Sequence, residues 1–270
     1  MGAKSTGLLA LCGLLLVALV VNAPAQQDER LKGLIDKAEA LLTQKANVFI
    51  RTYQTFTVNG QSQGESVQEV WVRDFEHLRA EKADGTIFTL TPEEVKLLHG
   101  PSHVVLLVPK ETLEKLGKDR EHALAQLGIG LPSALFRALV DSRDKLSITG
   151  QQTIGDEACW AVSVAEESLP AFGAALGASN PQMHLTAVEI VLGKESAALR
   201  AANFDMAGAA RVEVRQTVPD IQTDVEVTDQ MLTFATPEGA TVIEWTPDQK
   251  PEEVAQRFRQ AVLAATKPGP

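Results

Sequence analysis

Histidine and cysteine are the side chains of this sequence that first raise the question of metal binding or catalysis. His99 and His103 stand four residues apart, a spacing that would suit two metal ligands on a helix, but Gly100-Pro101 lies between them. We therefore expect a surface loop and no metal site there. Cys159 precedes Trp160 in an alternating segment, where an isolated cysteine is far more often a packing residue than a nucleophile.

Carboxylates are numerous but scattered along the chain. The pairs Glu93-Glu94 and Glu166-Glu167 are most simply solvated loop charges, and their spacing does not argue for the acid pair of a glycosidase. The sequence contains no GxSxG, HExxH or CxxC pattern and no phosphate-binding loop. These observations favour a protein that is not an enzyme and that needs no cofactor.

The first element of the chain has the pattern of an export signal. Lys4 gives a small positive region, and an apolar stretch from Leu8 to Val21 leads to the small residues Ala23-Pro24-Ala25. This arrangement predicts a cleavable secretory signal over residues 1–25, because the apolar run is short of the roughly 18–20 residues that a spanning helix needs. Cys12 lies inside the apolar run instead of closing it, so we expect a soluble exported protein without a lipid anchor.

Beyond the signal, the spacing of apolar residues changes from helical to strand-like. Asp28 can cap a helix that runs to about Lys45, and its apolar residues share one face: Leu31, Leu34, Ile35, Ala38, Leu41 and Leu42. From Asn47 the period is two, and Asn59-Gly60 and Asp84-Gly85 supply the turns of successive hairpins. The apolar run at 104–108 predicts a strand buried on both faces and covered by a helix.

Helices interrupt the strands midway and follow them at the end. We expect helices at 111–127 and 133–140, then strands at 146–151 and 158–164. Residues Pro170–Pro181 are rich in Ala and Gly and predict a mobile loop. Strands follow at 185–192, 198–206, 211–218, 223–227 and 240–245. A last helix is expected at 251–265, with Val254, Phe258, Val262 and Leu263 on one face.

The order of these elements predicts an α+β fold. We expect a strongly curved antiparallel sheet, an unclosed half-barrel, with helices covering its concave face. One domain would span residues 26–247, and a C-terminal helix and tail would follow at 248–270. The formal net charge of −10 argues against nucleic acid as a partner, because nucleic acid attracts Lys and Arg. We expect a monomer.

Three short patterns, in one order, carry a resemblance to a known family. They are Val70-Trp71-Val72-Arg73 on a predicted strand, Asp84–Pro92 at the second hairpin, and Leu232–Val242 near the C-terminus. With the export signal and the first helix, they make the chain similar to the LolA-like periplasmic outer-membrane lipoprotein carriers over most of residues 28–245. The resemblance implies a periplasmic carrier or chaperone that holds lipid or lipoprotein acyl chains in the apolar cavity of a LolA-like half-barrel.

The resemblance also implies site residues. The cavity would be lined by apolar strand positions: Val70, Val72, Phe88, Leu90, Val188, Ile190, Val212 and Val214. Arg73 would position the lid, although the carriers usually place an arginine at the next position, where this chain has Asp74. From the residues alone, an ordinary core is the simpler interpretation of these apolar side chains, and a solvated charge at a strand edge is the usual one for Arg73.

The resemblance leaves the pathway open. The implied ligands are the acyl chains of a lipoprotein or a phospholipid, and an inner- or outer-membrane protein could deliver or receive them. Relatives with this architecture also include periplasmic sensors, so the alternative is a regulatory protein that binds a partner protein and uses lipid as its signal. A hydrolase is disfavoured by the missing motifs.

Overall fold

A computed structural model describes most of the chain. It covers residues 47–127, 129, 132–175, 183–196, 198–223 and 225–266, together with helical residues at 29, 31–33, 35 and 36. The expected signal, most of the expected first helix, part of Pro170–Pro181 and the tail 267–270 lie outside the described residues. None of the helices in the described part has the length and apolarity that crossing a membrane requires.

One 12-stranded sheet organises the molecule, in the order β12-β6-β5-β4-β3-β2-β1-β11-β10-β9-β8-β7. Its strands are β1 (Val48–Val58), β2 (Gln61–Asp74), β3 (His77–Lys82), β4 (Ile87–Leu90), β5 (Glu94–His99), β6 (Val104–Pro109), β7 (Leu146–Ile154), β8 (Glu157–Val164), β9 (Met183–Gly193), β10 (Leu199–Gly208), β11 (Val212–Gln222) and β12 (Thr241–Glu244). Every neighbouring pair is antiparallel except β12 and β6, which run parallel. The two edge strands, β12 and β7, do not pair with each other, so the predicted unclosed sheet is confirmed.

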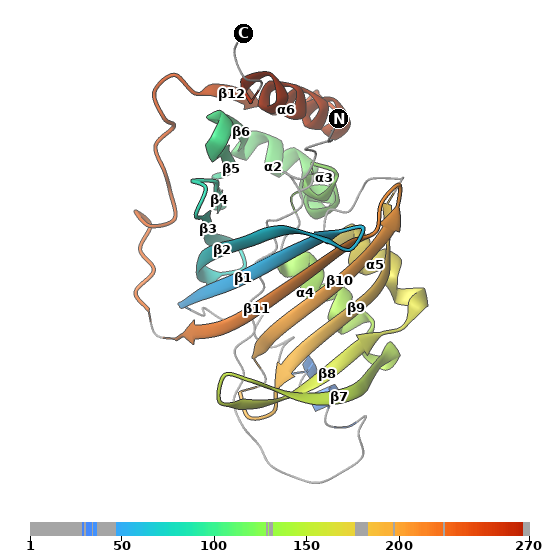
Figure 1. Ribbon diagram of the computed structural model, residues 1–270. Coiled ribbons are helices and arrows are strands. Elements are labelled where there is room, and N and C mark those ends of the chain that lie inside the picture. Colours follow the sequence, from blue (N-terminus) through green and yellow to red (C-terminus); the bar gives the residue numbers. More distant parts are fainter. Residues whose placement is uncertain are drawn as a thin grey trace.

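The helices gather on one side of this sheet. They are α2 (Lys110–Leu116), α3 (Arg120–Gln126), α4 (Pro132–Asp141), α5 (Leu169–Ala175) and α6 (Pro251–Ala265), with short 3-10 turns at Gly100–Ser102, Gly117–Asp119, Arg143–Lys145 and Glu166–Ser168. Figure 1 shows the sheet bending so that its two halves face different directions, with α2 and α3 beside one half and α4 and α5 beside the other. The predicted α+β arrangement of a curved sheet with helical cover is therefore confirmed.

Turn chemistry explains where the first hairpins lie. Asn59 and Gly60 have φ of 50° and 78°, the left-handed pair that a two-residue hairpin turn requires. Gly85 has φ of 80° in the turn between β3 and β4. Gly117, with φ of 50°, separates α2 from α3, so the single helix expected at 111–127 is two helices.

Several local predictions were wrong. Residues 170–175 of the expected loop belong to α5, because Phe172 and Leu169 are buried and alanine favours a helix. Glu94–His99 is a strand, although Glu93-Glu94 predicts a loop; both faces of β5 are covered, which removes the alternating pattern. The described residues of 223–227 form no strand, and Leu263 is 56% exposed instead of facing the core.

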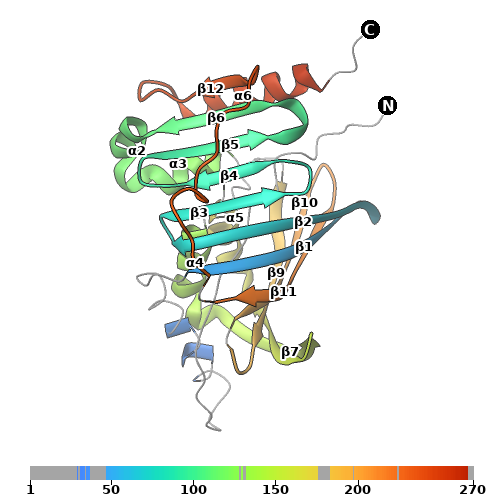
Figure 2. The same ribbon diagram turned by 90° about the vertical axis from the view of Figure 1, so that its left-hand side faces the viewer.

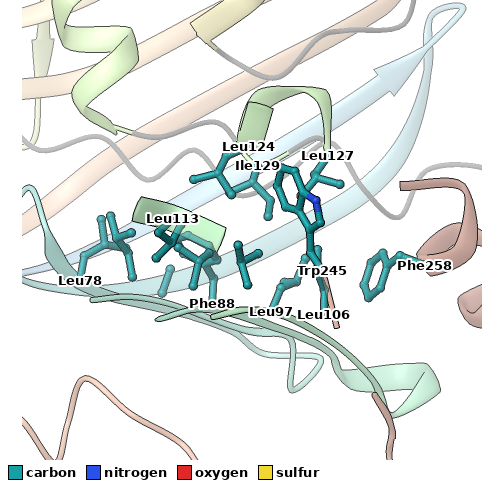
Figure 3. Packing of buried hydrophobic residues seen from close by; sticks show 14 of the residues in the cluster. Leu78, Phe88, Leu97, Leu106, Leu113, Leu124, Leu127, Ile129, Trp245 and Phe258 are labelled. Atoms are coloured by element: carbon teal, nitrogen blue, oxygen red, sulfur yellow. The ribbon is translucent and has the colours of Figure 1, made fainter. Parts of the chain in front are cut away.

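Two apolar clusters fill the space between sheet and helices. The first cluster joins β1–β6 to α2, α3, Trp245 and α6, and the second joins β7–β10 and part of β11 to α4, α5, Leu31 and Ile35. Figure 3 shows side chains of the first cluster from several elements: Leu78, Phe88, Leu97, Leu106, Leu113, Leu124, Leu127, Ile129, Trp245 and Phe258. The C-terminal helix therefore belongs to the same core as the first strands.

The opposite face of β3–β5 is crossed by a segment that we call the strap, residues 225–240. Figure 2 shows it running in front of these strands, with the helices behind them. Arg79 donates a hydrogen bond to the Thr233 carbonyl at 2.8 Å, and Lys96 donates one to the Phe234 carbonyl at 3.1 Å. The ammonium of Lys96 also lies 4.7 Å from the centre of the Phe234 ring. The third sequence pattern thus lies partly in a segment that covers the face turned away from the helices.

Candidate functional site

The eight residues predicted to line a cavity lie on the helix-covered face of the sheet. Val70, Val72, Phe88 and Leu90 belong to the first cluster. Val188, Ile190 and Val214 belong to the second cluster, and half-buried Val212 packs against it. The structure thus brings them together as two groups of four, one in each half of the sheet. They pack against other side chains: Phe88 and Leu90 are each 1% exposed.

A pocket opens elsewhere on the same side of the molecule, between α3, α5 and the start of β9. Its volume is about 570 Å³. The buried part of its lining includes Ala125, Leu169 and Leu185, and the last two are members of the second cluster. Part of the pocket floor is therefore formed by side chains of the second apolar cluster.

The rim of this pocket is polar. His122 and Gln126 of α3, Glu166 beside α5, and His184 of β9 belong to the lining, and all but half-buried Gln126 are exposed. The Gln126 amide nitrogen lies 3.2 Å from His122 Nε2, close enough to donate a hydrogen bond to it. Such a rim can hold a polar group in water while an apolar group enters below it.

No predicted site residue lies in this lining. The pocket is built where α3 meets α5, two helices that the sequence places far apart. Residues Pro170–Ala174 were expected in a loop, so the contact of this segment with β9 could not be anticipated. Helical spacing over residues 169–175 was the available signal, and the glycine and proline in the segment obscured it.

Arg73 lies near the end of β2, and its partner is Asp229 of the strap, with which it forms an ion pair and a hydrogen bond. This contact lowers the pKa of Asp229 below its ordinary value. The strap crosses the face of the sheet opposite to the helices (Figure 2). The structure therefore shows Arg73 holding the strap.

The other side chains that could bind a metal or act in catalysis are explained by packing and turns. Burial lowers the pKa of His99, whose Nδ1 lies 2.8 Å from Ser102 Oγ, and His103 has φ of 52° after a short 3-10 turn. Cys159 is fully buried, and burial raises the pKa of its thiol. Within the described residues, no three His, Cys, Asp or Glu side chains converge as a metal site would need.

Comparison with known proteins adds structural neighbours. Neither a protein-family profile nor a curated protein sequence matches this chain. An uncharacterized conserved protein from Thermus thermophilus is similar in structure, with 12% identity, a TM-score of 0.44, and coverage of 79% of this chain and 98% of that one. The MucA/MucB complex from Pseudomonas aeruginosa gives 13% identity, a TM-score of 0.39, and coverage of 78% and 62%. A LolA superfamily protein from Nitrosomonas europaea gives 9% identity and a TM-score of 0.33, with coverage of 75% of this chain and 97% of that one.

Proposed function

We propose that this protein is an exported binding protein that sequesters lipid or lipoprotein acyl chains beneath its helices, as a periplasmic carrier or chaperone. The observation that carries the proposal is the pocket between α3, α5 and β9, whose buried lining residues Leu169 and Leu185 belong to the apolar second cluster. An acyl chain that enters there would meet hydrocarbon side chains and leave its polar group at the rim.

The size of the pocket supports this proposal. Its volume of about 570 Å³ falls within the range of about 300–1,000 Å³ that is usual for small-molecule sites. Each methylene group moved from water into such an environment gains about 0.8 kcal/mol. Burial of even a few methylene groups would therefore contribute substantially to the binding free energy of an acyl chain.

Other parts of the proposal come from the sequence. Residues 1–25 would direct export and be removed, the domain would span 26–247, and the mature protein would act as a monomer. The eight strand residues named above would become cavity lining only if the helices move away from the sheet. Arg73 would act on lid position through the strap.

The experiment that tests the proposal is lipid analysis of the protein recovered from its own host. The full chain is expressed with its native export signal, purified without detergent, and examined by native mass spectrometry and lipid extraction. We expect masses of bound phospholipid or acylated protein, and displacement of them by a fluorescent fatty acid. An empty protein that also fails to bind the fluorescent fatty acid would rule the proposal out.

The sensor alternative predicts a different result in the same material. A sensor should retain one membrane protein in a stable complex, and lipid should change the affinity of that complex. A carrier should release its acyl cargo without such a partner. Pull-down from host membranes, with and without added lipid, separates the two functions.

A further inference from the structure

Three buried glutamines stand in the middle of the helix-covered face of the sheet. They are Gln54 on β1, Gln68 on β2 and Gln216 on β11, and each is at most 2% exposed. The strand pairing places Gln54 directly opposite Gln216, and Thr52 directly opposite Gln68. Directly opposite side chains on one face lie about 5 Å apart at their Cβ atoms, so these residues form one continuous group, which we call the polar belt.

The polar belt separates the two apolar clusters. Along β1, the buried face runs from Val48 and Ile50 of the first cluster, through Thr52 and Gln54, to Phe56, which packs against the second. The same change occurs along β11, where Gln216 lies between Val214 of the second cluster and Val218 of the first. Ala134 of α4 packs against both clusters, so α4 lies over this boundary.

The amide groups of the polar belt lack hydrogen-bond partners among the described residues. The unpartnered atoms are Oε1 of Gln54 and both amide atoms of Gln68 and of Gln216. A buried amide without a partner is costly, because folding has removed the water that satisfied it. Buried polar side chains normally have a partner, so this group indicates that something is missing from the face.

The chemistry of the belt restricts what could satisfy it. A glutamine amide offers both a donor NH₂ and an acceptor oxygen, and it carries no charge. A charged group placed there would be buried without an opposite charge from the belt, which is strongly unfavourable. A carbonyl, which accepts from NH₂, or a hydroxyl, which both donates and accepts, fits this set. Apolar clusters on both sides suit hydrocarbon extending in either direction.

We propose that the polar belt binds the neutral ester or amide linkage of an acylated lipid, with the acyl chains lying along the apolar clusters on either side. This inference rests on the proposed function and adds to it a subsite, the polar belt, that would hold the carbonyl linkage of the acyl chains. In this arrangement the belt selects lipids by the chemistry of their linkage.

The test compares two lipids that differ only at the linkage. Dipalmitoylglycerol and dihexadecylglycerol have chains of the same length, but the second replaces each ester carbonyl with a methylene group. Binding is measured by displacement of a fluorescent fatty acid from the full chain. We expect wild-type protein to prefer the diester by roughly two- to tenfold for each carbonyl held.

Substitutions in the belt make the test specific. Gln68→Met and Gln216→Met keep the side-chain volume but remove the amides, so each should weaken diester binding and leave diether binding unchanged. The same variants should unfold at an equal or higher denaturant concentration, because an unpartnered buried amide has been removed. Gln152→Met, on the exposed surface of β7, is the matched control and should keep the wild-type preference.

Each result of these binding measurements either supports or overturns the inference. Equal binding of the two lipids by wild-type protein, or an unchanged preference in both belt variants, would overturn the inference and leave ordered water only as the partner of the amides. Binding of neither lipid by wild-type protein would refute the proposed function and this inference together. A preference lost in one or both belt variants and kept in the exposed control would support it.

Discussion

Filling the pocket from its rim gives the sharpest test of where an acyl chain enters. Ala174 lies on α5, is exposed, and lines the pocket. In Ala174→Trp the indole would occupy space that we estimate at about four methylene groups of ligand. At about 0.8 kcal/mol for each group, the loss is about 3 kcal/mol, or roughly a hundredfold in Kd.

The neighbouring residue Ala171 provides the matched control. It is exposed on the same helix but lies outside the pocket lining. Both substitutions replace alanine by tryptophan in α5, so both should cost the helix about 0.5 kcal/mol of intrinsic propensity. We expect Ala171→Trp to bind a fluorescent fatty acid as wild-type protein does.

The assay measures fatty-acid affinity and the urea midpoint for all three proteins. The reasoning requires weak binding by Ala174→Trp alone, with urea midpoints that are equal for the two variants. If Ala174→Trp binds the fatty acid as tightly as wild-type protein does, the chain does not enter between α3 and α5. Equal losses in both variants would mean that the tryptophans act through α5 stability.

Three further predictions concern the scaffold. Gly100→Ala should lower the free energy of unfolding by about 1–3 kcal/mol in urea titrations, because the new Cβ would lie 2.3 Å from a backbone oxygen; Gly150→Ala, with nothing within 4 Å, should not. Burial alone would raise the pKa of Glu157, but hydrogen bonds from Ser196 and Arg200 outweigh it and lower that pKa. The stabilisation is therefore present above the unfolded-state pKa and lost as pH falls through the folded-state value, so Glu157→Gln should cost about 2 kcal/mol at pH 7 and flatten the acid limb of the stability profile. Phe258→Ala should cost about 3–5 kcal/mol by urea titration, because the ring is 1% exposed in the first cluster; a loss below 1 kcal/mol would contradict the packing of α6.

Local chemistry made part of the fold predictable from the sequence. Asn59-Gly60 and Asp84-Gly85 mark their turns because few other residues accept positive φ, and both turns are present. The helix expected at 251–265 is confirmed with those bounds. The buried run at 104–108 lies in β6. Val105 and Leu106 are adjacent in it and point to opposite faces of the sheet, and each is at most 1% exposed.

Features that depend on contacts between distant segments could not be predicted from the sequence. β5 was not predicted, because Glu93-Glu94 suggested loop charges and Lys96 does not fit a buried strand. Lys96 is buried by the strap, which lies far along the chain. The polar belt was missed for a related reason. Gln54 and Gln216 each look like ordinary strand residues, and only the pairing of β1 with β11 places them opposite each other.

The parallel pairing of β12 with β6 affects the order in which the protein can fold. Residue Thr241 pairs with Val104, so the edge of the first half is completed by a strand near the C-terminus. Until that strand has been synthesised, β6 offers unpaired backbone groups that another chain could join. Contacts between such distant segments also slow folding, since a long loop must close first. The half of the sheet that the ribosome makes first is therefore the half that is finished last.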